Sequence, residues 1–142
     1  METEVVTTSE EETRELAGRY AKQLAAGDVV CLQGPLGAGK TQFVKGMAGF
    51  FGVDPREVLS PTYTLIHEYD GTLPIFHFDC YRMENPEEAL EIGAEEYFYR
   101  EGVSVIEWPE KIRPLIPAHS RWINIEPLGP RERKFIFGNE KK

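Results

Sequence analysis

The sequence predicts an α/β fold, in one domain over residues 1–137, with a mixed, mostly parallel sheet flanked by helices. Short apolar runs at residues 29–32 and 103–106 have the continuous hydrophobicity of strands that are buried on both faces. Segments of helical periodicity alternate with these runs along the chain. The 142 residues, 41% hydrophobic and 28% charged, are enough for one compact core. We expect residues 138–142 to form a disordered tail.

The first predicted element is a helix near the N-terminus. Thr8 and Glu11 have the spacing of a capping box, in which a hydroxyl and a carboxylate satisfy backbone N–H groups at the start of a helix. Apolar residues then recur at helical spacing through residues 16–24, and Gly27 ends the pattern. The buried strand at residues 29–32 follows.

A glycine-rich turn leads from this strand into a second helix. From Lys40, apolar residues at helical spacing predict an amphipathic helix that closes at Gly52. The rough alternation of residues 63–69 predicts a half-exposed strand. The dipeptide Asp70-Gly71 then predicts a hairpin turn before a second strand at residues 74–79.

The C-terminal half is predicted to add one helix and three strands. A helix is expected over residues 85–97, because the opening Asn-Pro-Glu-Glu combines a good N-cap, a proline suited to the first turn and a capping-box glutamate. The strand at residues 103–106 follows. Residues 121–126 and 134–137 could form a late antiparallel hairpin at an edge of the sheet.

Charge and composition exclude several classes of protein. The chain has 24 acidic and 16 basic residues, for a formal net charge of −8, and its basic residues gather only briefly at residues 131–134. Direct, non-specific nucleic-acid binding needs many cationic contacts to phosphates and is therefore disfavoured. No apolar run approaches the ~18 residues of a membrane span, so we expect a cytoplasmic protein with no membrane partner. Cys31 and Cys80 lie in apolar segments and are predicted to be buried thiols.

The glycine-rich turn Gly34-Pro-Leu-Gly-Ala-Gly-Lys-Thr41 matches the phosphate-binding pattern G-x-x-x-x-G-K-[ST] at every fixed position. In this motif, backbone N–H groups surround phosphate oxygens, the lysine neutralises the β- and γ-phosphates, and the hydroxyl ligates Mg²⁺. A chance match is disfavoured by the strand before the turn and the helix after it. The motif predicts a P-loop NTPase-like domain whose nucleotide-binding residues are Pro35, Leu36, Gly37, Ala38, Gly39, Lys40 and Thr41.

Two acids at predicted strand ends are candidates for the rest of this site. Glu107 lies where a P-loop protein places a second acid on the Mg²⁺ side, although an acid that faces solvent is the alternative. Asp79 could orient or deprotonate an attacking water, and Arg82 could stabilise the transferred charge. The alternative for Asp79 and Arg82 is a local surface ion pair.

Further residues have two interpretations. Composition alone favours a structural role for Trp108. Thr62 follows Ser60-Pro61 in the position where P-loop switch proteins keep a loop that senses the γ-phosphate, but a simple turn or cap explains it as well. His77 shares a strand face with Asp79, yet neither it nor His67 has a third ligand at a usual spacing, so a metal site is not expected there.

Taken together, the motifs resemble the bacterial TsaE (YjeE) family of small P-loop ATPases, which are needed for the threonylcarbamoyladenosine modification at adenosine 37 of tRNA. Four blocks carry the resemblance in the family's order and similar spacing: Gly34–Thr41, Ser60–Thr64 (Ser-Pro-Thr-Tyr-Thr), His77–Arg82 (His-Phe-Asp-Cys-Tyr-Arg) and Glu107–Glu110 (Glu-Trp-Pro-Glu). A P-loop alone would indicate only a superfamily, whereas four ordered blocks indicate a family.

The resemblance implies more than the motifs do. It implies ATP as the nucleotide, Mg²⁺ held by Thr41 and Glu107, and a catalytic role for Asp79 with Lys40. It also implies partners of the TsaB and TsaD type, with tRNA engaged only indirectly through their complex. Additional nucleotide contacts, the adenine included, are expected from Thr8, Thr62, Trp108, Pro130 and Arg131.

Two departures from the family pattern concern the phosphate loop itself. Family members commonly have Asp where this chain has Pro35, and a second Thr where it has Gln42. The implied function is a weak ATPase that partners stimulate. A small-molecule kinase and a non-catalytic, ATP-dependent switch are the alternatives, although the few scattered arginines of the chain do not predict a kinase lid.

Overall fold

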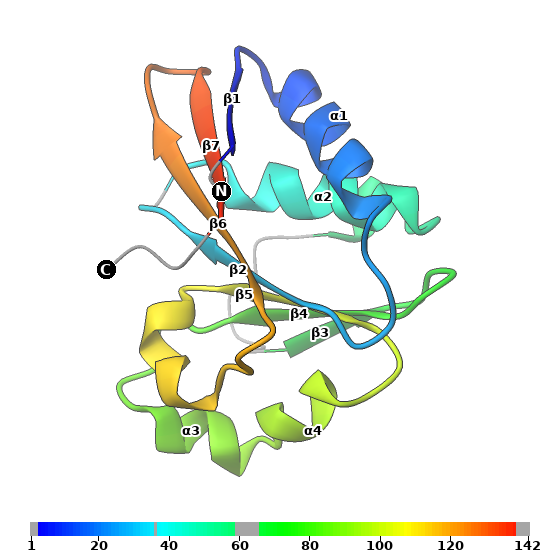
Figure 1. The fold of residues 1–142 in the computed structure, drawn as a ribbon, viewed down its shortest axis with the longest axis vertical. Helices are drawn as coiled ribbons and strands as arrows, with labels where there is room; N and C mark the ends of the chain where they lie inside the picture. The colour runs from blue at the N-terminus through cyan, green and yellow to red at the C-terminus, as the bar shows by residue number, and fades with distance from the viewer. Residues whose placement is uncertain (1–2, 36, 59–65, 139–142) are drawn as a thin grey trace.

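The computed structural model describes residues 3–35, 37–58 and 66–138, in which seven strands form one sheet in the order β1-β7-β6-β2-β5-β4-β3 (Figure 1). The strands are β1 (Thr3–Thr7), β2 (Val29–Gln33), β3 (Ile66–Tyr69), β4 (Ile75–Asp79), β5 (Val103–Glu107), β6 (Arg121–Pro127) and β7 (Arg133–Gly138). The helices are α1 (Glu10–Ala21), α2 (Lys40–Phe50), α3 (Pro86–Glu91) and α4 (Ala94–Phe98), with short 3₁₀ helices η1 (Pro55–Glu57) and η2 (Pro109–Leu115).

The predicted mixed, mostly parallel sheet is confirmed. Its four central strands, β6, β2, β5 and β4, run parallel to one another, while β3, β7 and β1 pair antiparallel with their neighbours. The late hairpin of β6 and β7 is also confirmed. It does not form the edge of the sheet, however, because β1 pairs with the outer side of β7.

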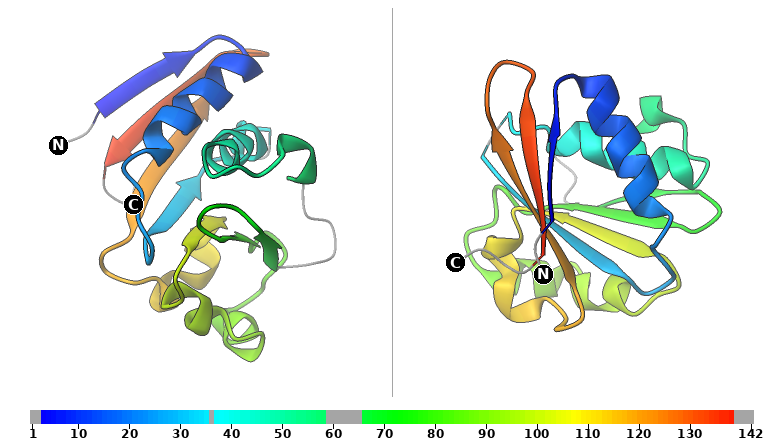
Figure 2. Two further views of the ribbon diagram at one scale, coloured as in Figure 1. Left: turned by 90° about the vertical axis from the view of Figure 1, so that its right-hand side faces the viewer. Right: turned by 45° about the horizontal axis from the view of Figure 1, so that its top comes forward.

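Helices cover both faces of the sheet, with α1 and α2 on one side and α3, α4 and η2 on the other (Figure 2). The strand β2 shows how the sequence builds these two layers. Val30 and Leu32 belong to the core under α1 and α2, whereas Val29 and Cys31 belong to the core under α3 and α4. A strand with both faces covered must be apolar throughout, as the sequence predicts. Cys31 and Cys80 are both buried, as predicted.

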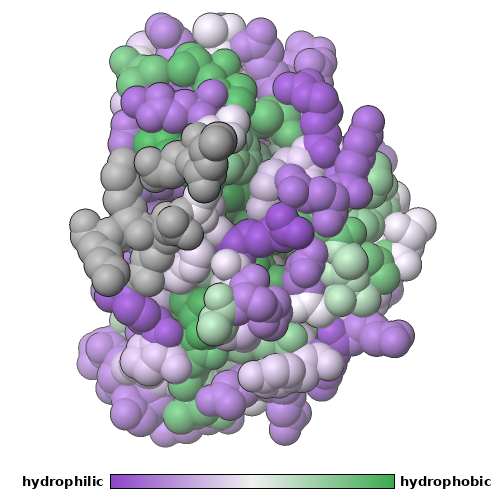
Figure 3. All heavy atoms as spheres, in the orientation of Figure 1, coloured by the Kyte–Doolittle hydropathy of each residue, from purple (hydrophilic) through white to green (hydrophobic). Residues whose placement is uncertain are grey.

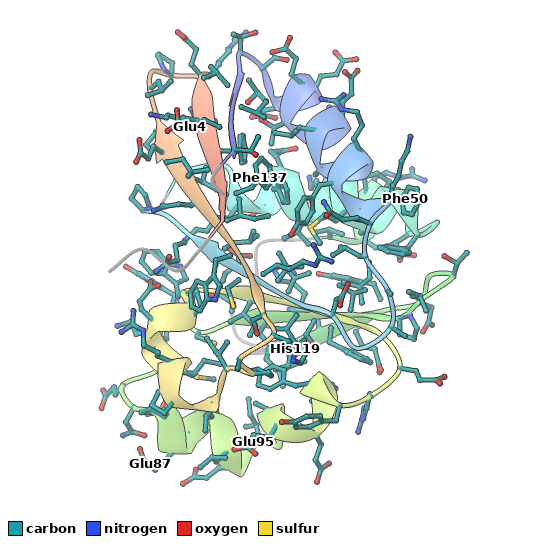
Figure 4. The ribbon with its side chains drawn as sticks, viewed as in Figure 1. Glu4, Phe50, Glu87, Glu95, His119 and Phe137 are labelled. Carbon is teal, nitrogen blue, oxygen red and sulfur yellow. The ribbon has the colours of Figure 1, made fainter. Side chains whose placement is uncertain are left out.

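Aromatic rings bind the helical layer to the late hairpin. Phe137 points from β7 toward α1 and α2 in Figure 4, and its ring stacks on Tyr20 of α1 at 5.3 Å between centroids. Phe43 of α2 stacks on Phe135 of β7 at the same separation. On the face seen in Figure 3, hydrophilic side chains dominate, and hydrophobic ones show between them in smaller patches. None of the helices that the structure describes is long and apolar enough to cross a membrane.

The first helix is capped one residue later than predicted. Ser9, and not Thr8, is the N-cap of α1, because its extended backbone lets Oγ accept a hydrogen bond from the backbone N–H of Glu12 at 3.0 Å. Glu12, and not Glu11, reaches back from the first turn: its carboxylate accepts hydrogen bonds from the N–H and the hydroxyl of Thr8, the residue before the cap, both at 2.6 Å.

Three other expectations need adjustment. The single helix predicted over residues 85–97 is two short helices, since Gly93 adopts a φ of 76° between α3 and α4. Gly138, predicted to begin the tail, is the last residue of β7. Thr62, the Ser60-Pro61 pair before it, Leu36 and residues 139–142 lie outside the described residues.

Helices α1 and α2 pack closely against each other at Gly46 of α2. A Cβ atom added to Gly46 of α2 would lie 2.2 Å from the carbonyl oxygen of Arg14 and 2.7 Å from Cβ of Ala17, both on α1. Nothing lies within 4 Å of a Cβ added to Gly49 on the same helix. The backbones of α1 and α2 can therefore approach this closely only because residue 46 has no side chain.

We expect Gly46→Ala to lower the free energy of unfolding by about 1–3 kcal/mol, the usual cost of overpacking a filled interface. Gly49→Ala should raise it by about 0.5–1 kcal/mol, because alanine is the better helix former and open space receives its methyl group. Urea unfolding of the two variants beside the parent measures both values. Equal effects at the two positions would contradict the close-packing interpretation.

Candidate functional site

The candidate site lies at the carboxyl edge of the parallel strands. The P-loop motif begins directly after β2, while Asp79 and Glu107 are the last residues of β4 and β5. These two acids are register partners, and Glu107 is also opposite Leu32 of β2. Parallel pairing therefore places both predicted acids beside the loop, at the edge where open α/β sheets bind ligands.

In the described part of the phosphate loop, two glycines have backbone conformations that favour glycine. Gly37 and Gly39 have φ values of 77° and 100°. Residues other than glycine adopt these backbone angles only with strain. The N–H of Ala38 closes a turn by donating to the carbonyl oxygen of Pro35 at 3.1 Å. Gly39 is the N-cap of α2, so the free N–H groups at the start of this 11-residue helix face the loop.

Lys40 is buried at the centre of this arrangement, with a relative exposure of only 5%. Its Nζ donates a hydrogen bond to the carbonyl oxygen of Gly34 at 2.7 Å and lies 3.6 Å from the centroid of the Trp108 ring. Burial lowers the pKa of the ammonium group, and the nearby carboxylates of Glu107, Glu110 and Asp79 act in the opposite direction. The site thus surrounds one cation with three acids and an aromatic face.

Trp108 belongs to the site and is not simply a core residue. It has a φ of 59°, and no other non-glycine residue that the structure describes has a positive φ. Its ring lies against the ammonium group of Lys40. The centroid of the Tyr81 ring is 4.9 Å from that of Trp108. A left-handed backbone at a bulky residue is strained and persists where the surroundings enforce it. In this conformation the indole lies against the ammonium group of Lys40.

A buried chain of hydrogen bonds holds Glu107. The Oε2 atom of Glu107 is 2.5 Å from Nε2 of His77, whose Nδ1 is 3.1 Å from the hydroxyl of Tyr69. An ionised carboxylate can only accept, so the imidazole donates from Nε2, and in its neutral form it accepts the tyrosine proton at Nδ1. Since His77 is fully buried, this chain fixes the orientation of the carboxylate.

Asp79 is held differently from Glu107. One carboxylate oxygen accepts a hydrogen bond from the backbone N–H of Tyr81 at 3.0 Å. Burial raises the pKa of Asp79, the Tyr81 hydrogen bond opposes this, and the charge of Glu107 raises the pKa further.

Arg82, proposed from sequence to act beside Asp79, is exposed. Burial lowers the pKa of His67, and its ring stacks on Tyr69.

The segments expected around the adenine come together next to the phosphate loop. Thr7, which precedes Thr8, pairs with Arg133 at the start of β7. Pro130 and Arg131 are exposed in the turn between β6 and β7. The guanidinium group of Arg133 joins this turn to the loop, because Nη2 donates to the carbonyl oxygen of Gly37 at 3.0 Å.

The sequence did not indicate the roles of Arg133, His77, Tyr69 and Tyr81. The position of His77 on the same face of β4 as Asp79 was a signal for the histidine, although its partner was not predictable.

Gln42, where the family commonly has threonine, accepts a hydrogen bond from Arg14 of α1 at 2.7 Å. In this chain, residue 42 therefore ties α2 to α1. Among the described residues, no group of three or more His, Cys, Asp and Glu side chains is arranged to hold a metal ion.

The fold and the site together define a P-loop NTPase-like protein. The family described as "Threonylcarbamoyl adenosine biosynthesis protein TsaE" has a sequence model that matches residues 7–135. This chain is also 37% identical to the protein of a solved structure, "Crystal structure of Bacillus subtilus YdiB", with a TM-score of 0.79 over 96% of this chain and 84% of that one.

Sequence relatives agree with this match. The tRNA threonylcarbamoyladenosine biosynthesis protein TsaE of Bacillus subtilis (strain 168) is 44% identical over 132 residues, which are 92% of this chain and 82% of the relative. The protein of the same name from Treponema pallidum (strain Nichols) is 40% identical over 91% of this chain and 95% of its own length. The chain belongs to the TsaE family, which takes part in threonylcarbamoyladenosine biosynthesis.

The environment of Asp79 predicts that its ionised carboxylate lowers the stability of the folded protein. Because the folded-state pKa lies above 3.8, the folded protein disfavours the ionised carboxylate; this cost is absent below pH 3.8 and complete above the folded-state pKa. Asp79→Asn keeps an oxygen for the Tyr81 N–H and removes the charge beside Glu107. Because solvent screens this half-exposed charge, we expect the variant to be more stable by at most about 1 kcal/mol near neutral pH.

Urea unfolding at neutral pH and at about pH 4 measures the effect of Asp79→Asn, which should be larger at the higher pH. Glu91→Gln, at an exposed position of α3, is the control for loss of an acidic charge. A variant less stable than the parent at neutral pH would show that the Asp79 carboxylate stabilises the fold.

Proposed function

We propose that this protein is a Mg²⁺-dependent ATP-binding protein and weak ATPase that supports the threonylcarbamoyl modification of tRNA by acting on a TsaB/TsaD-type complex. The observation that carries the proposal is the buried Lys40 at the P-loop, surrounded by the strand-end acids Asp79 and Glu107 in a chain of the TsaE family.

The phosphate loop supplies the triphosphate side of this proposal. The N–H groups at the start of α2 and the ammonium of Lys40 lie on the same short segment, so both would face one ligand. In the structure, Lys40 is held by a carbonyl oxygen and an aromatic face. Phosphate oxygens would be stronger partners for a buried ammonium group, which favours a polyanionic ligand.

The donors near Lys40 fit Mg²⁺. This ion prefers oxygen ligands, keeps several waters and needs few protein groups when phosphates complete its shell. The Glu107 carboxylate, buried and oriented by His77, and the Thr41 hydroxyl in the first turn of α2 supply such oxygens. When bound, the ion would neutralise phosphate charge, and these two residues would hold it.

Asp79 is proposed as the residue that orients or deprotonates the attacking water. Its raised pKa makes it a stronger base than an ordinary exposed aspartate, and the Tyr81 N–H fixes the direction of its carboxylate. Its register partner is Glu107, so a water near Asp79 would lie on the side of the site that would hold the metal. Turnover should be weak until partners complete the site.

The net charge of −8 supports an indirect role at tRNA. A net negative charge disfavours the phosphate contacts by which proteins hold nucleic acid without sequence preference. We therefore propose that a TsaB/TsaD-type complex contacts the tRNA, while this chain provides the nucleotide cycle. The family name states the pathway and leaves these partners to experiment.

Reconstituted modification tests the proposal. Threonylcarbamoyladenosine formed in tRNA by the partner proteins should require this chain, ATP and Mg²⁺. Lys40→Ala should reduce partner-stimulated ATP hydrolysis by at least about 100-fold, since it removes the cation that faces the transferred phosphoryl group. Lys45→Ala, further along α2, is the matched control and should hydrolyse ATP like the parent.

Asp79→Ala separates the proposed ATPase from a switch that needs only ATP binding. The proposal predicts that this variant binds ATP, does not hydrolyse it and stalls after at most one round of modification. Full modification by Asp79→Ala would establish the switch. Modification that proceeds equally well without this chain would refute the proposed role altogether.

The hydrogen bond from His77 to Glu107 predicts a metal phenotype. His77→Leu leaves Glu107 without its donor, so we expect about 10- to 100-fold more Mg²⁺ to be needed for half-maximal ATP binding, the usual effect of losing a group that orients a ligand. His77→Gln keeps an amide donor near the position of Nε2 and should recover part of the affinity. Equal Mg²⁺ midpoints for the parent and both variants would contradict this role of His77.

A further inference from the structure

Arg133, the first residue of β7, makes an unusual set of contacts for a charged side chain. Its Nη1 donates hydrogen bonds to the carbonyl oxygens of Gly129 at 2.9 Å and Glu132 at 3.0 Å. Its Nη2 donates to the carbonyl oxygen of Gly37 at 3.0 Å and lies 3.5 Å from that of Pro130. One guanidinium group thus donates hydrogen bonds to the backbone of the phosphate loop and to the backbone of the β6–β7 turn.

The contact with Gly37 bears directly on the loop. The carbonyl of Gly37 and the N–H of Ala38 belong to one planar peptide, so a hydrogen bond that holds the oxygen also sets the direction of the N–H. The same side chain lies over Gly39, where a Cβ would be 3.4 Å from Nε of Arg133. Arg133 therefore hydrogen-bonds one of the two positive-φ glycines of the loop and occupies the space beside the other.

We propose that Arg133 is a positioning residue that fixes the Gly37–Ala38 peptide and joins the phosphate loop to the β6–β7 turn, so that the two act as one binding unit. The inference rests on the proposed ATP site, because the turn carries Pro130 and Arg131 on the expected adenine side. Arg133 acts through the backbone, and no phosphate contact of its own is required.

The geometry of the guanidinium group explains why arginine serves here. Its N–H groups lie in one plane and diverge, so Nη1 can bind the turn while Nη2 binds the loop. A lysine ammonium carries the same charge without this fixed fork. Arg133→Lys therefore distinguishes a positioning role from a general contribution of positive charge, which lysine would preserve.

Titration with a fluorescent ATP analogue in the presence of Mg²⁺ tests the inference. Arg133→Ala and Arg133→Lys should both weaken binding by at least about tenfold, the change expected when hydrogen bonds from a charged group are lost. Lys134→Ala is the matched control, because Lys134 pairs with Glu4 of β1 at 3.4 Å and should leave binding unchanged. Methylguanidinium should restore binding to Arg133→Ala beyond the effect of NaCl at equal ionic strength.

A double-mutant cycle tests the coupling itself. If Arg133 joins the turn to the loop, Arg131→Ala should weaken ATP binding in the parent and have a smaller effect in an Arg133→Ala background. Backbone amide exchange at residues 37–40, which does not depend on nucleotide, should be faster in both Arg133 variants than in the Lys134→Ala control. This second readout also applies to a variant of reduced stability, provided that its global unfolding is measured in parallel.

The possible failures can be told apart. A parent protein that does not bind ATP would overturn the proposed function and this inference with it. If the parent binds ATP but Arg133→Lys binds equally well, or if exchange at residues 37–40 is unchanged, only the positioning role is refuted. Full additivity of the Arg131 and Arg133 changes would refute the coupling between turn and loop.

Discussion

The ammonium group of Lys40 is almost completely buried at the carboxyl edge of the sheet, where it contacts the Gly34 carbonyl oxygen and the face of the Trp108 ring. Burying a charge is costly unless hydrogen bonds and opposite charges compensate it. The compensation comes from different parts of the fold: the carbonyl from the loop, the indole from the residue after β5, and carboxylates from the ends of β4 and β5. The site exists only when these elements are correctly paired.

Parallel pairing is what brings the elements together. Asp79 and Glu107 are neighbours because β4 and β5 run in the same direction and in register, and Lys40 reaches them because the loop of residues 34–39 leads from the end of β2 into α2. A shift of one residue would turn His77 away from Glu107 and open the buried hydrogen-bond chain. The apolar sequences of β2, β4 and β5, which are buried on both faces, therefore also fix the geometry of the site.

Local sequence patterns predicted most of the central strands and the phosphate loop. They predicted much less of the outer strand and of the side-chain contacts that hold the loop in place. The glycine motif and the buried strands depend on short-range patterns, so their positions followed from residue types alone. Strand β1 gave no such signal, because Thr3–Thr7 is largely exposed and becomes a strand by pairing with β7. Arg133 lay in an ordinary basic cluster, and its contact with Gly37 exists only after the hairpin folds beside the loop.

The charges of the site constrain how a nucleotide could enter it. Three carboxylates, from Asp79, Glu107 and Glu110, act on the buried ammonium group of Lys40. A triphosphate alone would bring further negative charge into surroundings that already repel it, and Lys40 cannot offset both. A divalent cation that enters with the nucleotide would resolve this imbalance, with Glu107 already oriented by His77. On the proposed function, Mg²⁺ dependence is therefore a consequence of the same carboxylates to which hydrolysis is assigned.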